Sequence, residues 1–463
     1  MKCVAIHESM HKKSNKTERA GVRMPSDAPL CRTCWQDGLR TTGRALYSRR
    51  VLIHRVNLCL IYWIIITFPF GAQADWLQWG GPQRDFKPTD VELAETWPAA
   101  GPREVWRRRL GDGYSSIVTV NKCLFTMYRG DDREHVVALD AQTGRTIWEH
   151  RYDIRFLDGT NVEEFGPGPL ATPLIVDNRI CAVGVTGVLH CLASDTGTVI
   201  WTRDLLRELQ GTSLYRGYSA SPIAWRNTVI LPVGGPGRGL VAFRLTDGSI
   251  EWQKHDFAIS HVSPIMIRRG HQDQLVVLAE KLIAGIDPGT GRMLWQYAHP
   301  INGGYMSSTP VYGDDGRLFF SAAYGAGSRC LLLDDESDMT VVEEIWHNQR
   351  MRVHHSNVIR VGDVVYGSSG DFSALVFTAL DLNTGKVLWQ QRGLGRASCI
   401  YADGRFIILQ EDGTLMLATM TPQDMTVHAK VQLFDGRGWT GPIVDGKRLY
   451  IRNREEIMAL ELP

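Results

Sequence analysis

The sequence predicts an all-β protein, an eight-bladed β-propeller with four-stranded antiparallel blades. Three observations lead to this fold class: a hairpin motif recurs along the chain, a tryptophan holds a fixed place in it, and successive tryptophans are 42 to 53 residues apart. Repeats of about 40 to 50 residues with several short strands each are typical of propeller blades. The 463 residues, with 46 glycines, suit one closed, turn-rich ring.

The motif is clearest in ALDAQTGRTIW, residues 138 to 148. Ala138-Leu139-Asp140 reads as the end of a strand, and the Asp140 carboxylate is suited to accept hydrogen bonds from the turn that follows. Gly144 tolerates the positive φ that such a turn needs. A returning strand with alternating faces then leads to Trp148. The motif therefore predicts a hairpin that presents one indole ring at a fixed offset.

Four further close copies keep the turn glycine four residues before the tryptophan: CLASDTGTVIW (191–201), AFRLTDGSIEW (242–252), GIDPGTGRMLW (285–295) and ALDLNTGKVLW (379–389). A looser copy without that glycine ends at Trp346, Trp106 fits the series without a preceding turn, and an eighth place near Val431 has lost its tryptophan. A buried tryptophan contributes up to about 250 Å² of contact area, so we expect these rings to dominate packing between blades. The expected docking residues are Trp106, Trp148, Trp201, Trp252, Trp295, Trp346 and Trp389.

The two ends of the repeat region complement each other. The last strands, expected over 448–453 and 456–463, lack a following TG and tryptophan, whereas the first one, around Trp106, lacks a preceding ALD strand. Together they would make one blade, and such a closure removes the free edges of the ring. We therefore expect residues 75–463 to form a single propeller domain.

Residues 1–74 read as a leader segment that is removed or disordered in the mature protein. Arg49, Arg50 and Arg55 precede an apolar stretch over 56–70, and Ala72-Gln73-Ala74 then forms an A-x-A cleavage pattern. This is the layout of a secretory signal, and the apolar stretch is shorter than the about 20 residues of a membrane span. We expect export to the periplasm or beyond through a signal ending near Ala74. Residues 1–50 are more than such a signal needs, so an N-terminal membrane anchor stays open.

Charge divides the chain at the same place. Residues 1–74 hold 12 Lys and Arg against 4 Asp and Glu, a net of +8, and the whole chain is +1, which leaves −7 for residues 75–463. A mildly acidic body argues against nucleic acid as the partner. Five cysteines lie in this body, and Cys181 and Cys191 flank one expected hairpin turn. They read as small buried residues, although a pairing between these two stays open.

The A-L-D-x-x-T-G-x-x-x-W copies resemble the tryptophan-docking motif of the pyrroloquinoline-quinone (PQQ) repeat family, over about residue 76 to the end. The resemblance implies eight blades, each with a tryptophan packed on its neighbour. The stretch DWLQWGGPQRD (75–85) also resembles the start of secreted PQQ-like proteins of unassigned role. The copies depart from the motif where Ala193 and Arg244 replace the aspartate.

A small polar cluster follows most of the tryptophans by roughly ten residues, just before the strand that should line the axis. Ser and Thr there satisfy the backbone where strands begin, but several larger side chains are more varied than turn chemistry requires. The candidate axial binding residues are Tyr218, Ser219, His261, Tyr305, Ser307, His354, His355, Asn357, Arg396 and Trp439. Neighbours in a strand point to opposite faces, so His354 and His355 are not expected to share a metal ion, and we expect no metal site.

These features favour an exported binding or protein-interaction scaffold without catalytic activity. Its partner would be a protein, a small molecule or a glycan at the channel face, with at most peripheral or N-terminally anchored contact with a membrane. Non-enzymatic propellers of the family include an outer-membrane assembly lipoprotein, but here Asp75, not cysteine, follows the expected cleavage site.

The alternative is a PQQ-dependent dehydrogenase that oxidises alcohols or sugars. Enzymes of the family hold PQQ with Ca²⁺ and cap it with a disulfide of adjacent cysteines. This sequence has no adjacent cysteines and no C-x-x-C-H for a haem, so we expect no cofactor, with PQQ and Ca²⁺ as the alternative. An enzyme of another class that uses the axial residues also stays open.

Overall fold

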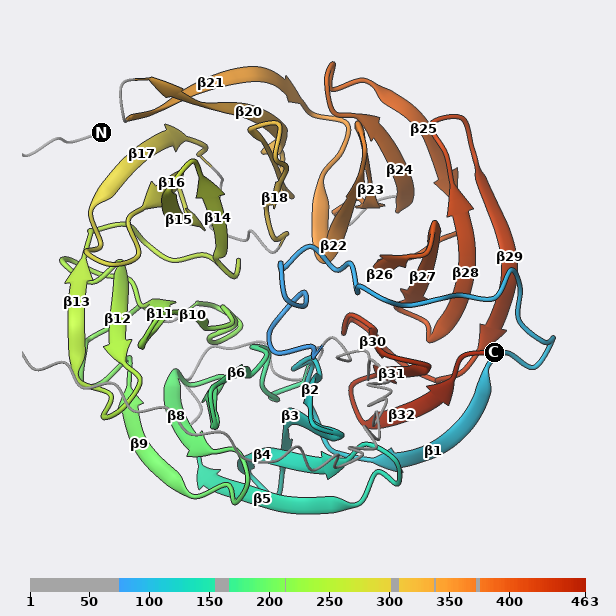
Figure 1. Cartoon of the computed structure of the whole chain (residues 1–463), viewed down its shortest axis with the longest axis horizontal. Helices are drawn as coiled ribbons and strands as arrows, with labels where there is room; N and C mark the ends of the chain where they lie inside the picture. The colour runs from blue at the N-terminus through green and yellow to red at the C-terminus, as the bar shows by residue number, and fades with distance from the viewer. Residues whose placement is uncertain (1–74, 155–165, 213, 301–307, 337–338, 372–374) are drawn as a thin grey trace, which may run out of the picture. The chain divides into compact units, whose positions relative to one another are not determined.

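The computed structural model describes residues 75–154, 166–212, 214–300, 308–336, 339–371 and 375–463. Tyr305 and Ser307 lie outside these ranges, as does the leader. The chain divides into residues 1–68 and 69–463, and every described residue belongs to the second unit. This unit is an eight-bladed β-propeller, which confirms the predicted fold class (Figure 1). The described part of the chain holds no helix with the length and hydropathy of a membrane span.

Each blade is a four-stranded antiparallel meander that runs from the axis to the rim. Blades 1 to 4 consist of β2 (Val118–Val120), β3 (Cys123–Gly130), β4 (Arg133–Asp140) and β5 (Thr146–Asp153); β6 (Leu174–Val176), β7 (Arg179–Val183), β8 (Val188–Ala193) and β9 (Val199–Asp204); β10 (Ile223–Trp225), β11 (Thr228–Pro232), β12 (Leu240–Arg244) and β13 (Ile250–Lys254); β14 (Ile265–Arg269), β15 (Gln272–Leu278), β16 (Leu282–Ile286) and β17 (Met293–Ala298).

Blades 5 to 7 follow in the same order, and blade 8 is assembled from both ends of the described chain. Their strands are β18 (Val311–Tyr312), β19 (Arg317–Ala322), β20 (Gly327–Glu336) and β21 (Met339–Asn348); β22 (Val353–Val361), β23 (Val364–Ser369), β24 (Val376–Asp381) and β25 (Val387–Arg392); β26 (Ala397–Ala402), β27 (Arg405–Gln410), β28 (Thr414–Met420) and β29 (Met425–Gln432); β30 (Ile443–Asp445), β31 (Arg448–Arg452), β32 (Glu456–Glu461) and β1 (Arg103–Arg109).

The core lies between the blades and is built by their middle strands. In blade 3, every residue of β11 and nearly every residue of β12 is buried, whereas β13 at the rim is exposed except for Trp252. A strand covered on both faces reads as a continuous apolar run, and a half-covered strand alternates. This difference explains why the outer strands gave the clearest pattern in the sequence.

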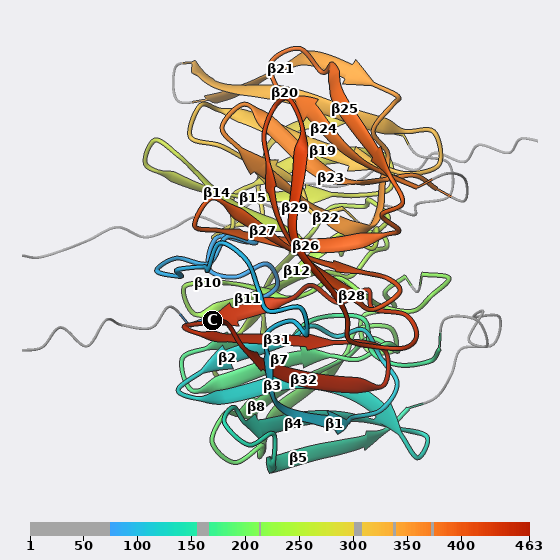
Figure 2. The same ribbon diagram turned by 90° about the vertical axis from the view of Figure 1, so that its right-hand side faces the viewer.

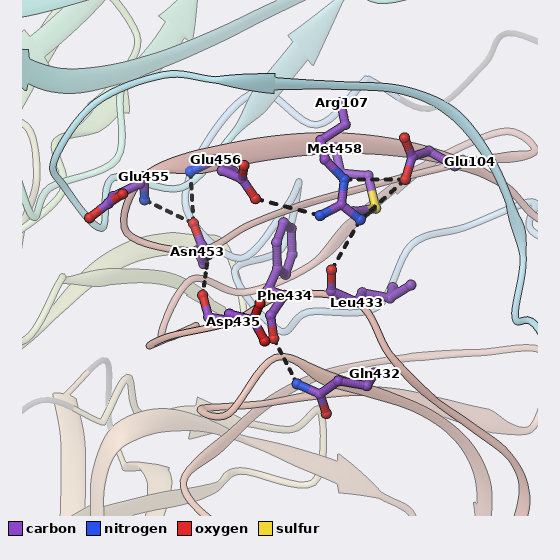
Figure 3. A network of polar contacts seen from close by, with 10 residues as sticks. All are labelled: Glu104, Arg107, Gln432, Leu433, Phe434, Asp435, Asn453, Glu455, Glu456 and Met458. Carbon is purple, nitrogen blue, oxygen red and sulfur yellow. Dashed lines mark hydrogen bonds and ion pairs between the residues drawn. The ribbon is translucent and has the colours of Figure 1, made fainter.

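The ring closes in blade 8 by antiparallel pairing of β1 with β32, as expected from the incomplete repeats at the two ends. Figure 2 shows β31, β32 and β1 side by side on this flank of the ring. Side chains reinforce the closure towards blade 7 (Figure 3). Arg107 donates to the Leu433 carbonyl at 3.0 Å, forms ion pairs with Glu104 and Glu456, and covers the Phe434 ring at 5.5 Å.

The indole rings connect successive blades through one repeated hydrogen bond. In six of the seven cases the indole Nε1 donates to a carbonyl at the turn between the third and fourth strands of the next blade, at 2.7–3.0 Å. The donor–acceptor pairs are Trp106–Ala141, Trp148–Ser194, Trp201–Leu245, Trp252–Pro288, Trp346–Leu382 and Trp389–Thr421. The motif therefore carries both halves of a joint, the donor of one blade and the acceptor turn of the next.

Two joints differ from this pattern. Trp295 donates to the Gln274 side chain of its own blade at 2.7 Å, because blade 5 has a long hairpin where the turn glycine is missing. In the joint from blade 7 to blade 8, Val431 takes the place of the indole and lies against Gly101, where an added Cβ would come within 2.7 Å of Val431. At the eighth motif position, which lacks a tryptophan, Val431 itself makes the contact with the next blade.

Candidate functional site

The two ends of the ring are chemically different. In an antiparallel meander the beginning of the first strand and the loop between the second and third strands lie at the same edge. We call this end of the ring the start face, and the opposite end, where first strands turn into second strands, the turn face. The candidate axial residues within the described ranges precede inner strands or lie in their first half, so the topology places them on the start face or just inside it.

The small hydroxyl residues form a belt that links neighbouring inner strands. The backbone N–H of Ser116 donates to Thr172 Oγ1, that of Thr172 to Ser221 Oγ, and that of Ser221 to Ser263 Oγ, at 2.9–3.2 Å. These four residues are buried. The side chains of Thr172, Ser221 and Ser263 satisfy backbone donors, as the simpler interpretation of the sequence held, but across blades instead of within a strand.

Tyr218 and Asn357 also serve the architecture. Tyr218 is 2% exposed, and its hydroxyl donates to the carbonyl of Pro232 in its own blade at 2.7 Å. Burial raises its pKa well above the ordinary value for a tyrosine. The Asn357 amide makes two bonds to Cys399 of the next blade, accepting from its N–H at 2.9 Å and donating to its carbonyl at 2.7 Å. Both side chains are thus engaged within the ring.

Ser219 and His261 bring blades 3 and 4 together on the start face. Ser219 Oγ lies 2.6 Å from Nδ1 of His261, and both residues are half-buried. The pKa of His261 is lowered to about 4, first by burial and then by the positive charge of Arg216. The imidazole is therefore neutral at pH 7, and its ring is oriented by the serine hydroxyl.

His354 occupies the corresponding place in blade 6. Its Nε2 lies 3.0 Å from the hydroxyl of Tyr324, and the two rings pack edge to face with centroids 5.0 Å apart. The pKa of His354 is lowered to about 3, first by burial and then by the charges of Arg396, Arg216 and His261. The charged groups that act on this imidazole belong to blades 3, 4 and 7.

Arg396, Glu411 and Trp439 form a third polar group, where blade 7 meets blade 8. Glu411 Oε2 accepts from Arg396 Nη1 at 3.3 Å and from the Trp439 indole at 3.1 Å. A second Arg396 nitrogen donates to the Asp371 carbonyl at 2.7 Å. The Trp439 ring packs against Tyr114, with ring centroids 5.2 Å apart. Tyr114 is buried and Trp439 is half-buried, so neither aromatic side chain extends freely into solvent.

The sequence did not single out Arg216, Tyr324 or Glu411, which complete these groups. Tyr324 and Glu411 lie in loops between second and third strands, whereas the polar clusters in the sequence mark only the segments before first strands. Both kinds of segment meet at the start face. Counting strands within each repeat would therefore have located the loops that hold Tyr324 and Glu411. Of the remaining candidates, His355 lies in β22 without a described side chain.

The start face offers hydrogen-bond donors and neutral imidazoles, and its described residues do not fit a metal. Among the described ranges, no three or more His, Cys, Asp or Glu side chains gather as ligands. Ca²⁺ takes oxygen ligands, but Asn357 and Glu411 already serve other partners. The described side chains therefore do not supply the donor set that Ca²⁺ with PQQ would need.

The five cysteines of residues 75–463 are free thiols, and four of them are buried. Cys181 and Cys191 lie directly opposite each other on β7 and β8, as the sequence allowed. A hydrogen bond between the two thiols raises the pKa of Cys181 well above its ordinary value and lowers that of Cys191. The pair packs in the apolar core between blades 2 and 3.

Fold and repeat define a PQQ-like eight-bladed propeller, and comparison with known families agrees. The family model described as outer membrane protein assembly factor BamB matches residues 98–253 and 132–391, more than half of the chain. The protein belongs to this family of PQQ-like propellers, which confirms the resemblance seen in the sequence. No functionally curated protein matches the chain.

Solved structures of similar fold include enzymes. A quinohemoprotein alcohol dehydrogenase from Pseudomonas putida HK5 aligns with a TM-score of 0.60 at 11% identity, over 84% of this chain and 80% of that one. One from Comamonas testosteroni gives 0.58 at 12% identity over the same shares. BamB from Moraxella catarrhalis gives 0.40 at 18% identity, over 76% of this chain and 84% of that one. At these identities the likeness shows the fold alone.

Proposed function

We propose that this propeller is a non-catalytic binding scaffold that holds an anionic ligand at its start face. The proposal rests on the electrostatics of two imidazoles: the charge of Arg216 acts on both His261 and His354, and Arg396 acts on His354 as well. The description of its family as an assembly factor supports a role in binding.

The electrostatics of the two imidazoles favour an anion. Burial and neighbouring positive charge both lower the pKa of His354, to about 3, and that of His261, to about 4. A carboxylate or phosphate placed between them would oppose both effects, since a nearby opposite charge favours the protonated form. Binding would then take up protons. The same ligand would accept charge-assisted hydrogen bonds from the arginines.

Calorimetric titration of the purified mature protein with inorganic phosphate, glucuronate and an acidic peptide tests the proposal. We expect at least one probe to bind, more tightly at pH 5 than at pH 8. His354→Gln and Arg396→Gln should weaken binding at least tenfold. Arg133→Gln, which alters an exposed ion pair with Asp153, should not. Absence of binding by all three probes, or equal loss in the control, would refute an anion site at the start face.

The second candidate is a PQQ-dependent dehydrogenase, favoured by the fold it shares with two quinohemoprotein alcohol dehydrogenases. Adding PQQ and Ca²⁺ to the mature protein tests it directly. A bound-quinone absorbance together with alcohol- or sugar-dependent dye reduction would replace the scaffold by an enzyme. We expect neither signal, because the described side chains do not supply Ca²⁺ ligands.

We further propose that the propeller works outside the cytoplasm, after cleavage near Ala74. The support is the apolar stretch and the A-x-A pattern of the leader. Cell fractionation and N-terminal sequencing of the mature chain test this placement. A mature protein that starts at Met1 in the cytoplasm would contradict it.

A further inference from the structure

Residues 75–86, which we call the axial segment, precede the first blade and belong to none of the eight sheets. Figure 1 shows the blue beginning of the described chain crossing the middle of the ring. Two large side chains of this segment, Trp76 and Phe86, are almost fully buried, and so is Arg84. These three buried side chains give the segment the packing of a core element, although it has no regular secondary structure.

The backbone of the axial segment binds the inner strands of three blades. Trp76 and Thr119 of blade 1 exchange two backbone hydrogen bonds of 2.9 and 3.1 Å. Leu77 accepts from the N–H of Ile175 in blade 2 at 2.8 Å, and Phe86 accepts from that of Tyr401 in blade 7 at 3.1 Å.

Two side chains extend these contacts to three more blades. Arg84 donates to the carbonyls of Pro222 in blade 3 and Pro264 in blade 4, the latter at 2.7 Å. The Trp79 indole donates to Thr309 of blade 5 at 2.9 Å. The segment therefore holds six of the eight blades by hydrogen bonds. Only an element that lies across the axis can reach all of them.

Both ends of the axial segment lie at the turn face, and its middle reaches inward. The Asp75 carboxylate accepts a hydrogen bond from the backbone of Asn121, in the turn after β2. Beyond the other end, Leu93 donates to Asp403 in the turn after β26 at 3.0 Å. The tip of the loop turns at Gly80, whose φ is +74° and where an added Cβ would lie 2.9 Å from Arg84 Cα.

We propose that the axial segment is a plug, inserted from the turn face, which locks the inner strands around it and closes that end of the axis. Its anchor is the buried Arg84 guanidinium, which ties two blades to the segment. Side chains of the plug reach Pro222, Pro264 and Thr309, just before the inner strands of blades 3, 4 and 5 begin, so the plug extends along the axis from the turn face towards the start face. This assignment does not depend on which ligand, if any, the start face binds.

Hydrogen exchange of the mature chain tests the plug. Arg84→Met removes the anchor, and Gln83→Ala, at an exposed neighbouring position, is the matched control. We expect at least tenfold faster exchange in Arg84→Met for peptides that contain Thr119, Ile175 and Tyr401. Peptides from β22 and from the outer strands should keep their rates, because the described residues show no hydrogen bond from those strands to the segment.

An equal rise in exchange over the whole ring, or no rise at all, would overturn the plug. If Arg84→Met does not fold, Trp79→Phe decides the question. This variant keeps a ring against Phe86, now packed edge to face at 5.1 Å, and loses the bond to Thr309. Faster exchange should then be largest next to the segment in blade 5, and a change confined to the rim would refute the proposal.

Discussion

The joint between blades 2 and 3 and the joint between blades 4 and 5 meet the same need with different residues. In the first, the Trp201 indole donates directly to the Leu245 carbonyl in the turn of blade 3. In the second, Trp295 donates to Gln274, whose amide in turn donates to Thr340 of blade 5 at 2.8 Å. A buried indole N–H requires an acceptor in both cases.

The neighbouring turn decides which acceptor the indole finds. Blade 3 supplies a tight turn with Gly248 at φ +68°, where an added Cβ would lie 2.6 Å from the Trp201 ring. Blade 5 has no such glycine, and its outer strands, β20 and β21, are ten residues each. Blade 4 compensates with Gly285, whose missing side chain leaves room for the Trp295 indole to turn back to its own sheet. The tryptophan is thus constant, whereas its partner depends on the adjacent blade.

Removing the indole from the regular joint should have the largest effect. Trp201→Ala deletes a buried ring and leaves a cavity, and such truncations cost about 3–5 kcal/mol of unfolding free energy. Equilibrium urea unfolding measures the loss. Tyr215→Ala, an aromatic truncation at a residue 47% exposed, is the control and should change stability little. A loss below 1 kcal/mol for Trp201→Ala would show that the indole does not hold the joint.

A second contact between blades, at Glu134 of blade 1, should respond to pH. Glu134 is fully buried and accepts from the Val185 N–H of blade 2 at 2.9 Å and from the Tyr152 hydroxyl at 2.7 Å. Burial raises its pKa to about 7, against the opposing hydrogen bonds. The folded state therefore holds this proton more tightly than the unfolded one, so stability is lost as pH rises from about 4.5 through 7.

Glu134→Gln removes that titration. Because folding raises the pKa of the wild-type carboxyl from 4.5 to about 7, its ionisation at higher pH costs the folded state about 3 kcal/mol. We expect the variant to match the wild type at pH 4 and to exceed its unfolding free energy at pH 8.5. Urea unfolding at both pH values checks this, with the exposed Glu251→Gln as control. Identical pH profiles for wild type and variant would contradict a proton-linked joint.

Gln274→Leu should break the hydrogen bonds that link Trp295 through Gln274 to Thr340. We expect a smaller loss of unfolding free energy than for Trp201→Ala. The substitution leaves one buried indole N–H without an acceptor. An unsatisfied buried donor lowers the free energy of unfolding by about 1–3 kcal/mol. The effect should be absent from the regular joint, so a double variant with Trp201→Ala should be additive. If Gln274→Leu is neutral, Trp295 has another acceptor, and the contrast between the two kinds of joint loses its basis.

The smallest effect is expected beside a docking tryptophan but on the other face of the strand. Ile147 is 48% exposed, although it adjoins Trp148. Surface substitutions usually change stability by less than about 0.5 kcal/mol, so Ile147→Thr should be nearly neutral by urea unfolding. A large loss would indicate that the outer strands are covered in solution.

Part of the start face was predictable from the sequence. The clusters before the inner strands contain Ser219, His261, His354, Arg396 and Trp439, and the structure places these residues on the start face. The sequence did not predict which candidate side chains form hydrogen bonds within the ring, because those bonds depend on distances between blades. Tyr218 and Asn357 have the same residue types as binding groups, yet they bond to backbone atoms of the ring.

The sequence by itself determined the number of blades, the docking tryptophans and the blade shared by the two ends of the chain. These features are local and periodic, so a hairpin and its tryptophan can be recognised within a dozen residues. Tertiary structure alone decided what happens on the axis. Arg84 meets Pro264, and His354 comes under the influence of Arg216, only once the ring is closed. Contacts between such distant positions do not recur with the repeat. Local sequence patterns therefore cannot predict them.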